Sequence, residues 1–123
     1  MTTAPLSGIR ILDLSRVLAG PIASMTLGDL GANVIKVERP NGGDDTRAWG
    51  PPFDERGESA YYLSINRNKL SITLDYANPA DLELVRHLVA EADAVLDNFR
   101  PGTLERWGLD VNAILKKHRK LVW

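Results

Sequence analysis

The sequence contains no cysteine, and this absence removes several kinds of chemistry from its 123 residues. Disulfide bonds, thiolate nucleophiles and cysteine-ligated zinc are excluded, and the composition fits a reducing compartment. No stretch approaches the roughly 20 apolar residues that a membrane-spanning helix needs. The first residues carry neither the basic region nor the apolar run of a secretory signal. We therefore expect a cytoplasmic protein without a membrane partner.

An excess of one charge sign is also missing. Fifteen Lys and Arg residues face sixteen Asp and Glu residues, for a net charge of −1. No global basic surface is available to follow a phosphate backbone, so we do not expect a nucleic-acid partner. The two histidines, His87 and His118, stand alone without metal-ligand spacing, and we expect no metal site. Hydrophobic residues make up 44% of the chain, which is ordinary for a folded domain.

Short apolar segments alternate with helical patterns along the chain. We expect strands at 9–14, 33–38, 71–75, 94–96 and 121–123, helices at about 20–30 and 79–92, and two short helices with Thr103 and Asp110 as N-caps. The type of the apolar element at 60–65 is left open. This alternation predicts an α/β fold, with a Rossmann-like parallel sheet that helices cover on both faces. Because the fifth strand begins at the last residues, we interpret the chain as an N-terminal segment of a larger protein.

Residues 40–58 have a different composition. Glycine, proline and acidic residues dominate this stretch, and no helix or strand period is visible. We expect a long loop within a single α/β segment that covers residues 1–123. Long ordered loops in compact domains are usually functional or mobile.

Parallel sheets bind ligands at the carboxyl ends of their strands, and three polar clusters follow predicted strands. Residues 15–21 follow the first strand but lack the G-x-G-x-x-G dinucleotide fingerprint. Gly20 in this cluster either permits a close approach of a ligand or backbone, or simply forms a tight turn. After the second strand, Glu38 suits a ribose hydroxyl and Arg39 a phosphate, with a surface salt bridge as the alternative.

The cluster after the fourth strand is the strongest nucleotide-binding candidate. Asn98 offers a hydrogen-bond donor and an acceptor, Phe99 can stack on a purine, and Arg100 and Arg106 are cations near a predicted helix start. Residues 66–69 lie instead at the amino end of the third strand, where a polar turn is favoured over an anion site. We interpret Asp13, inside the first strand, as a structural hydrogen-bonding group.

Several motifs in a fixed order resemble the opening of the family III CoA-transferases. They are the segments 5–14, 18–21, 27–40, 42–47, 66–71 and 98–102, which together extend over nearly the whole chain. The family includes formyl-CoA, carnitine and succinyl-CoA-dependent transferases as well as α-methylacyl-CoA racemases. The loop at 43–53, with residues 61–64, looks most like the succinyl-CoA-dependent transferases that act on dicarboxylates.

The resemblance implies coenzyme A as substrate, with an acyl-CoA donor and a carboxylic acid acceptor. It also implies a set of CoA-binding residues: Val17, Leu18, Arg39, Thr73, Leu74, Asp75, Tyr76, Asn98, Phe99, Arg100, Pro101, Gly102, Thr103 and Arg106. Leu18 stands where the formyl-CoA enzyme has a glutamine, so that substrate contact is not reproduced. The nucleophilic aspartate of the family lies beyond residue 123, and no catalytic residue is expected here. The family forms an interlocked homodimer.

Three other functions remain open from the sequence. An acyl-CoA racemase would share this fold but would need a separate acid/base pair to move the α-proton. A binding segment would hold CoA or another nucleotide without turnover. A dinucleotide-dependent oxidoreductase is disfavoured because the glycine fingerprint is missing.

Overall fold

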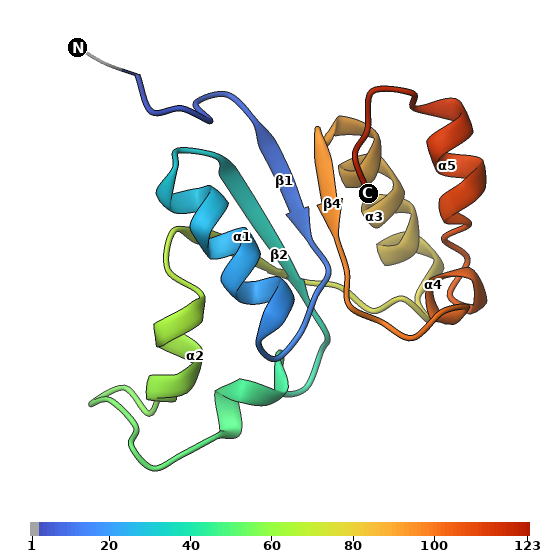
Figure 1. The fold of residues 1–123 in the computed structure, drawn as a ribbon. Helices are drawn as coiled ribbons and strands as arrows, with labels where there is room; N and C mark the ends of the chain where they lie inside the picture. Colours follow the sequence, from blue (N-terminus) through green and yellow to red (C-terminus); the bar gives the residue numbers. More distant parts are fainter. Residues whose placement is uncertain (1–2) are drawn as a thin grey trace.

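The sheet predicted from the sequence is present in the computed structural model, which describes residues 3–123 (Figure 1). Its strands are β1 (Arg10–Asp13), β2 (Asn33–Glu38), β3 (Lys69–Thr73) and β4 (Ala94–Leu96). They lie in the order β3-β2-β1-β4, and all neighbouring pairs are parallel. The α/β prediction is confirmed, and the carboxyl ends of all four strands lie at the same edge of the sheet.

Helices cover both faces of this sheet. They are α1 (Ala19–Asp29), α2 (Ala60–Ile65), α3 (Pro79–Glu91), α4 (Thr103–Arg106) and α5 (Val111–Lys117), with a 3₁₀ turn η1 (Asp45–Ala48). Figure 1 shows α1 and α2 on one side of the sheet and α3, α4 and α5 on the other. The element at 60–65, whose type the sequence leaves open, is therefore a helix. Within residues 3–123, none of the helices has the length and apolar character to cross a bilayer.

Helix N-caps were mostly predictable from local chemistry. Asn78 accepts a hydrogen bond from the Ala80 N–H at 2.9 Å, and Asp110 accepts one from the Ala113 N–H at 2.9 Å, as predicted. The prediction for Thr103 is wrong, because Gly102 occupies the N-cap position with a φ of +79°. Glycine suits this left-handed conformation, and its use there moves Thr103 into the first turn of α4.

Two strand predictions need correction. β3 begins at Lys69, two residues before the predicted start, because it pairs with β2 from Val34 onward. The expected fifth strand at 121–123 is only a single parallel bridge between Ala94 and Val122. Val122 alone makes both ladder hydrogen bonds, accepting from Val95 at 2.9 Å and donating to Asp93 at 3.1 Å.

The segment 40–58 is more ordered than its composition suggested. Asp44 caps η1 by accepting a hydrogen bond from the Thr46 N–H at 3.0 Å. Phe53 and Ser59 form an isolated antiparallel bridge, and the Ser59 hydroxyl accepts a bond from the Tyr62 N–H to begin α2. The segment is the long connection expected from the sequence, and it contains a 3₁₀ turn.

The strands alternate their side chains between two hydrophobic clusters. On the α3 side, Leu12 and Val37 pack with Val85 and Val89 of α3 in the larger cluster. On the α1 side, the smaller cluster contains Ile11, Ala32 and Val34, with Leu27 of α1 packed against it. This period of two fixes which strand residues can reach each face. It also places Asp13, Lys36 and Glu38 on the α1 side, although all three are polar.

Candidate functional site

A cavity of about 300 Å³ lies at the carboxyl ends of the strands. Residues that follow all four strands line it, as expected for a ligand site in a parallel sheet. Its lining consists of Leu14, Ser15, Arg16, Lys36, Val37, Glu38, Arg39, Pro40, Gly43, Asp44, Leu74, Asp75, Tyr76, Ala77, Phe99 and Trp107. A space of this size accepts part of a nucleotide.

Five of the predicted binding residues line this cavity, namely Arg39, Leu74, Asp75, Tyr76 and Phe99. The other nine are not in its lining: Val17, Leu18, Thr73, Asn98, Arg100, Pro101, Gly102, Thr103 and Arg106. Most of these nine lie one or two residues from a lining residue, on the same connecting loops. Their roles in binding stay predictions.

Three aromatic side chains form one wall of the cavity. The rings of Tyr76 and Trp107 stack with centroids 4.7 Å apart, and Phe99 meets Trp107 edge-on at 5.0 Å. Burial raises the pKa of the Tyr76 hydroxyl. Among the described residues, this hydroxyl is the one buried side-chain polar atom without a hydrogen-bond partner. A buried polar atom without a partner is uncommon in folded proteins.

Two guanidinium groups line the same cavity. Arg16 lies over the Phe99 ring, 4.8 Å from its centroid, and forms no ion pair within residues 3–123. Arg39 pairs with Asp45, and both of these side chains are exposed to solvent. Exposed ion pairs are weak, so Arg39 can exchange this carboxylate for a phosphate. The surface salt bridge considered from the sequence is thus present, and it is compatible with an anion site.

The sequence reasoning did not assign Arg16 or Trp107 to the site. Arg16 lies within the first polar cluster, and its position after a strand was the available signal. Trp107 follows Arg106 directly, but its place depends on how α4 packs, which no local pattern reveals. The aromatic wall therefore appears only when Tyr76, Phe99 and Trp107 are brought together by the fold.

Both polar atoms of the Asn98 side-chain amide form hydrogen bonds within the protein. Its Oδ1 accepts a hydrogen bond from the Arg16 N–H at 2.9 Å, and its Nδ2 donates to the Arg16 carbonyl at 2.7 Å. The side chain therefore joins the loop after β4 to the loop after β1. This contact fixes the backbone that carries Arg16.

Glu38 is occupied by protein partners. Its carboxylate accepts hydrogen bonds from Arg47 Nε at 2.7 Å, Ser71 Oγ at 2.7 Å, the Asp44 N–H at 2.8 Å and Tyr62 Oη at 2.9 Å. Burial acts to raise the pKa of Glu38, but these bonds together lower it to about 2. The carboxylate has little capacity left for a ribose hydroxyl, which further disfavours dinucleotide binding.

Asp13 is fully buried and also saturated. It accepts hydrogen bonds from the Ser15 N–H at 2.9 Å, Ser24 Oγ at 2.5 Å and Lys69 Nζ at 3.1 Å. Burial lowers the pKa of Lys69 despite this carboxylate partner. A Cβ atom on Gly20 would collide with the Ser15 side chain, so Gly20 permits a close backbone approach rather than a ligand contact. These contacts agree with the structural interpretation of Asp13.

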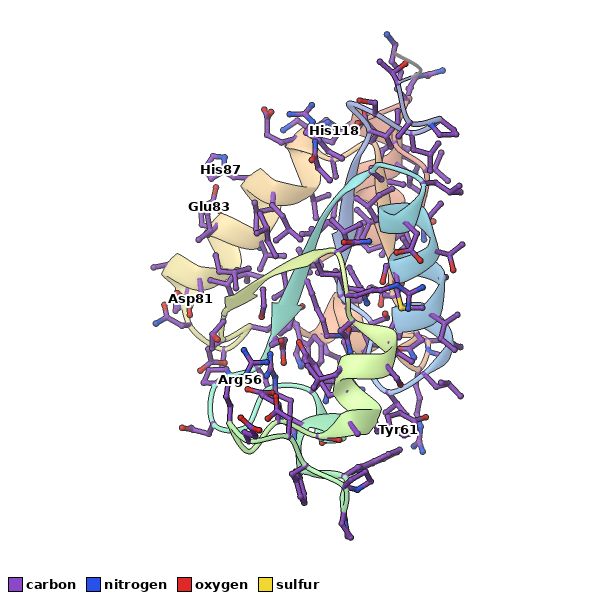
Figure 2. All side chains as sticks on the ribbon, turned by 90° about the vertical axis from the view of Figure 1, so that its left-hand side faces the viewer. Arg56, Tyr61, Asp81, Glu83, His87 and His118 are labelled. Carbon is purple, nitrogen blue, oxygen red and sulfur yellow. The ribbon has the colours of Figure 1, made fainter. Side chains whose placement is uncertain are left out.

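The polar residues at 66–68 and on α3 do not line the cavity. Arg67 Nη2 and Asn68 Nδ2 bind the Asp29 carboxylate at 2.6 and 2.7 Å, which makes residues 66–68 a polar turn, as favoured from the sequence. Figure 2 shows His87 and Glu83 projecting from the outer side of α3, with 3.7 Å between Nε2 and Oε1. Across residues 3–123, no three His, Asp or Glu side chains converge as a metal site would require.

Comparison with known proteins places these features in a family. The sequence profile described as CoA-transferase family III matches residues 6–123. Succinyl-CoA:glutarate CoA-transferase of Mus musculus is 56% identical over 112 residues, which are 91% of this chain and 26% of that protein. Succinate--glutarate CoA-transferase of Agrobacterium fabrum is 51% identical, over 97% of this chain and 31% of that protein.

Solved structures show the same fold. A CAIB/BAIF family protein from Brucella suis has a TM-score of 0.87 and 51% identity, and the match covers 94% of this chain and 31% of that one. The chain thus spans between a quarter and a third of the length of the relatives it matches. Since the profile extends over nearly every residue, and the relatives share both sequence and fold with it, this chain belongs to CoA-transferase family III.

Proposed function

We propose that this chain is the CoA-binding N-terminal segment of a CoA-transferase that moves CoA from succinyl-CoA to a dicarboxylic acid. The observation that carries the proposal is the cavity at the strand ends, where the guanidinium groups of Arg16 and Arg39 meet an aromatic wall. Coenzyme A combines a purine with several phosphates, and cations beside aromatic rings match that combination. The names of the glutarate CoA-transferases among the relatives support the choice of acyl donor and acceptor.

The predicted residues have different proposed roles in binding. Arg39, Arg100 and Arg106 supply positive charge for the phosphates, and Phe99 with Tyr76 offers aromatic surface for the adenine. The segment 73–76 contributes backbone groups at the end of β3, and Asn98–Thr103 forms the loop around the nucleotide. Val17 and Leu18 lie on the loop after β1, which in the resembling enzymes is near the thioester.

The transfer chemistry itself requires a nucleophile. In this family an aspartate carboxylate attacks the thioester and splits one difficult exchange into easier steps. By the resemblance, that aspartate lies beyond residue 123, so we propose no catalytic residue in this chain and expect the segment alone to be inactive. We further propose that the longer protein works as a cytoplasmic homodimer and uses CoA without a metal ion.

A calorimetric titration tests the binding part of the proposal. We expect the protein to bind CoA and not NAD, since the glycine fingerprint is absent and Glu38 is occupied. Arg106→Ala is expected to weaken CoA binding by about 1–3 kcal/mol, because a charge-assisted hydrogen bond to phosphate is lost. The matched control is Arg56→Ala, because Arg56 is exposed and pairs with Asp54 in its own turn. This variant should keep the wild-type affinity for CoA.

Each outcome of this titration has a clear meaning. An unchanged affinity in Arg106→Ala would remove that residue from the site. Binding of NAD alone would favour the oxidoreductase. In the longer protein, transfer of CoA from succinyl-CoA to glutarate should be measurable, and exchange of the α-proton without transfer would favour the racemase instead.

A further inference from the structure

The loop between β1 and α1 contains an unusual backbone conformation. Val17 has a φ of +68°, in the left-handed region that a β-branched side chain rarely adopts. Such a conformation persists only when the surrounding structure holds it, and it is often found at functional sites. Arg16, the residue before it, lines the cavity. The question is therefore which groups hold this loop.

Side chains from three other segments bind the backbone of this loop, and two of them, Lys36 and Asp44, are buried. Lys36 Nζ of β2 donates to the Ser15 carbonyl at 2.8 Å, and Asn98 binds both the N–H and the carbonyl of Arg16. The Val17 N–H donates to the Asp44 carboxylate, at 3.3 Å to Oδ1 and 3.2 Å to Oδ2. Five consecutive polar groups of the loop are thus fixed when the bond from the Ser15 N–H to Asp13 is included.

Asp44 is the anchor that contacts the strained residue directly. Its side chain is fully buried and forms an ion pair with Lys36 at 2.9 Å. Burial acts to raise the pKa of Asp44, but bonds from Thr46 and Lys36 hold it below the usual value. The carboxylate is therefore charged and has a fixed orientation. Its position is fixed in turn by Glu38, which accepts from the Asp44 N–H at 2.8 Å.

Gly43 is required for this arrangement. It has a φ of +65°, and a Cβ atom there would collide with the Glu38 carboxylate and lie 2.9 Å from Cδ and Nε of Arg47. The chain can place Asp44 against Val17 only because it turns tightly over Glu38 at this point. The glycine-rich and acidic segment 40–58 thus brings Asp44 to the backbone of Val17, a role that its composition alone did not reveal.

We propose that Asp44 is a positioning residue, which holds Val17 in the left-handed conformation and thereby fixes Arg16 in the wall of the cavity. This role rests on the proposed CoA-binding function. Asn98 restrains Arg16 from the other side, so the two anchors act on neighbouring peptide groups. Asp44 also lines the cavity, but its carboxylate is engaged by Lys36, Thr46 and Val17, so its effect on binding passes through the loop.

A double-mutant cycle with Val17→Gly tests this role by calorimetric titration of CoA. Asp44→Asn is expected to weaken CoA binding about tenfold, the scale of one lost charge-assisted contact. Glycine adopts a positive φ without strain, so the same substitution in a Val17→Gly background is expected to weaken binding less than threefold. Asp54→Asn, in the same loop but bonded only to Arg56 and Glu58, is the control and should bind as wild type. Equal losses in both backgrounds would overturn the proposal.

A second readout does not depend on CoA. In the NMR spectrum of Asp44→Asn, the Val17 amide is expected to exchange faster with solvent, and its coupling constant should report a negative φ. If Val17 keeps its protection and its positive φ, the positioning role is wrong whether or not CoA binds. A wild-type protein that fails to bind CoA would refute the proposed function alone. Should Asp44→Asn not fold, exchange of the Val17 amide in the wild-type protein tests the same bond, and an unprotected Val17 amide there would likewise overturn the proposal.

Discussion

The two faces of the sheet are built differently where the strands end. On the α3 face, Leu12 and Val37 continue an apolar cluster along the length of the strands. On the α1 face, the apolar cluster around Ile11 and Val34 gives way to buried Asp13, Lys36 and Glu38 toward the carboxyl ends. Burial of apolar side chains on the α3 face stabilises the fold, but these non-directional contacts do not fix the conformation of the loops. The polar network on the second face has directed bonds, which hold the loops around the cavity.

The largest expected effect comes from breaking the network at Lys36. Lys36→Met leaves the Asp44 carboxylate buried without its cation, and removal of one partner from a buried ion pair costs about 3–5 kcal/mol of unfolding free energy. The measurement is urea unfolding followed by circular dichroism. The double variant Lys36→Met/Asp44→Asn removes both charges and is expected to recover more than half of this loss.

An exposed ion pair provides the matched control for this prediction. Arg10 and Glu91 are 2.7 Å apart, but their side chains are 53% and 73% exposed. Arg10→Met is expected to change the unfolding free energy by about 1 kcal/mol or less. If Arg10→Met and Lys36→Met cost the same, the buried network would have no special structural weight, and the contrast between the two faces would fail.

A smaller effect is expected from acid. Burial acts to raise the pKa of Glu38, but hydrogen bonds from Arg47, Ser71, Asp44 and Tyr62 lower it from 4.5 to about 2. A lowered carboxyl pKa stabilises the fold above pH 4.5, and this stabilisation is lost as the pH falls from about 4.5 to about 2. Its full size is about 3 kcal/mol.

Unfolding in urea at pH 6, 4 and 3 measures this loss. Glu38→Gln should be less stable than wild type at pH 6, and the difference should shrink as the pH falls. Leu109→Ala on the α3 face is the reference, because Leu109 is fully buried among apolar side chains. Its cost of about 3 kcal/mol is expected to be the same at each pH. A Glu38→Gln difference that stays constant with pH would contradict the assigned pKa.

How much of the fold could be predicted from the sequence depends on whether a contact is local or distant in the chain. The Asn78 and Asp110 caps were predictable because each side chain binds an N–H two or three residues away. The ion pair between Glu38 and Arg47 joins residues nine apart, and the bond from Val17 to Asp44 joins residues 27 apart, so neither left a local pattern. Residues 40–58 therefore gave only a loop prediction.

The candidate site was predictable in a similar, partial way. Its place at the strand ends follows from the parallel sheet, and the resemblance to a family supplied the nucleotide residues. Tyr76 and Phe99 of the aromatic wall were predicted, but Trp107 was not, because it joins them through the packing of α4. Whether a polar residue such as Asn98 contacts the ligand or a neighbouring loop depends on geometry that residue type does not specify.

The smallest expected effect concerns the two confirmed helix caps. Asn78→Ala removes the acceptor for the first turn of α3 and is expected to lower the unfolding free energy by about 1 kcal/mol. Thermal unfolding should show this as a fall in Tm of about 4 °C. Asp110→Ala removes the same kind of bond from α5 and is the matched comparison.

The two caps should not be equivalent, because the helices differ in what they bury. α3 places Val85 and Val89 in the large cluster, whereas α5 has no fully buried residue. Val111, Ile114 and Leu115 of α5 pack against that cluster but are only partly buried. Fraying of α5 therefore exposes less core surface than fraying of α3 and can occur before global unfolding. We expect Asp110→Ala to lower Tm by less than half of the shift for Asn78→Ala. Equal shifts would mean that α5 and α3 unfold together as one cooperative unit, despite the partial burial of α5.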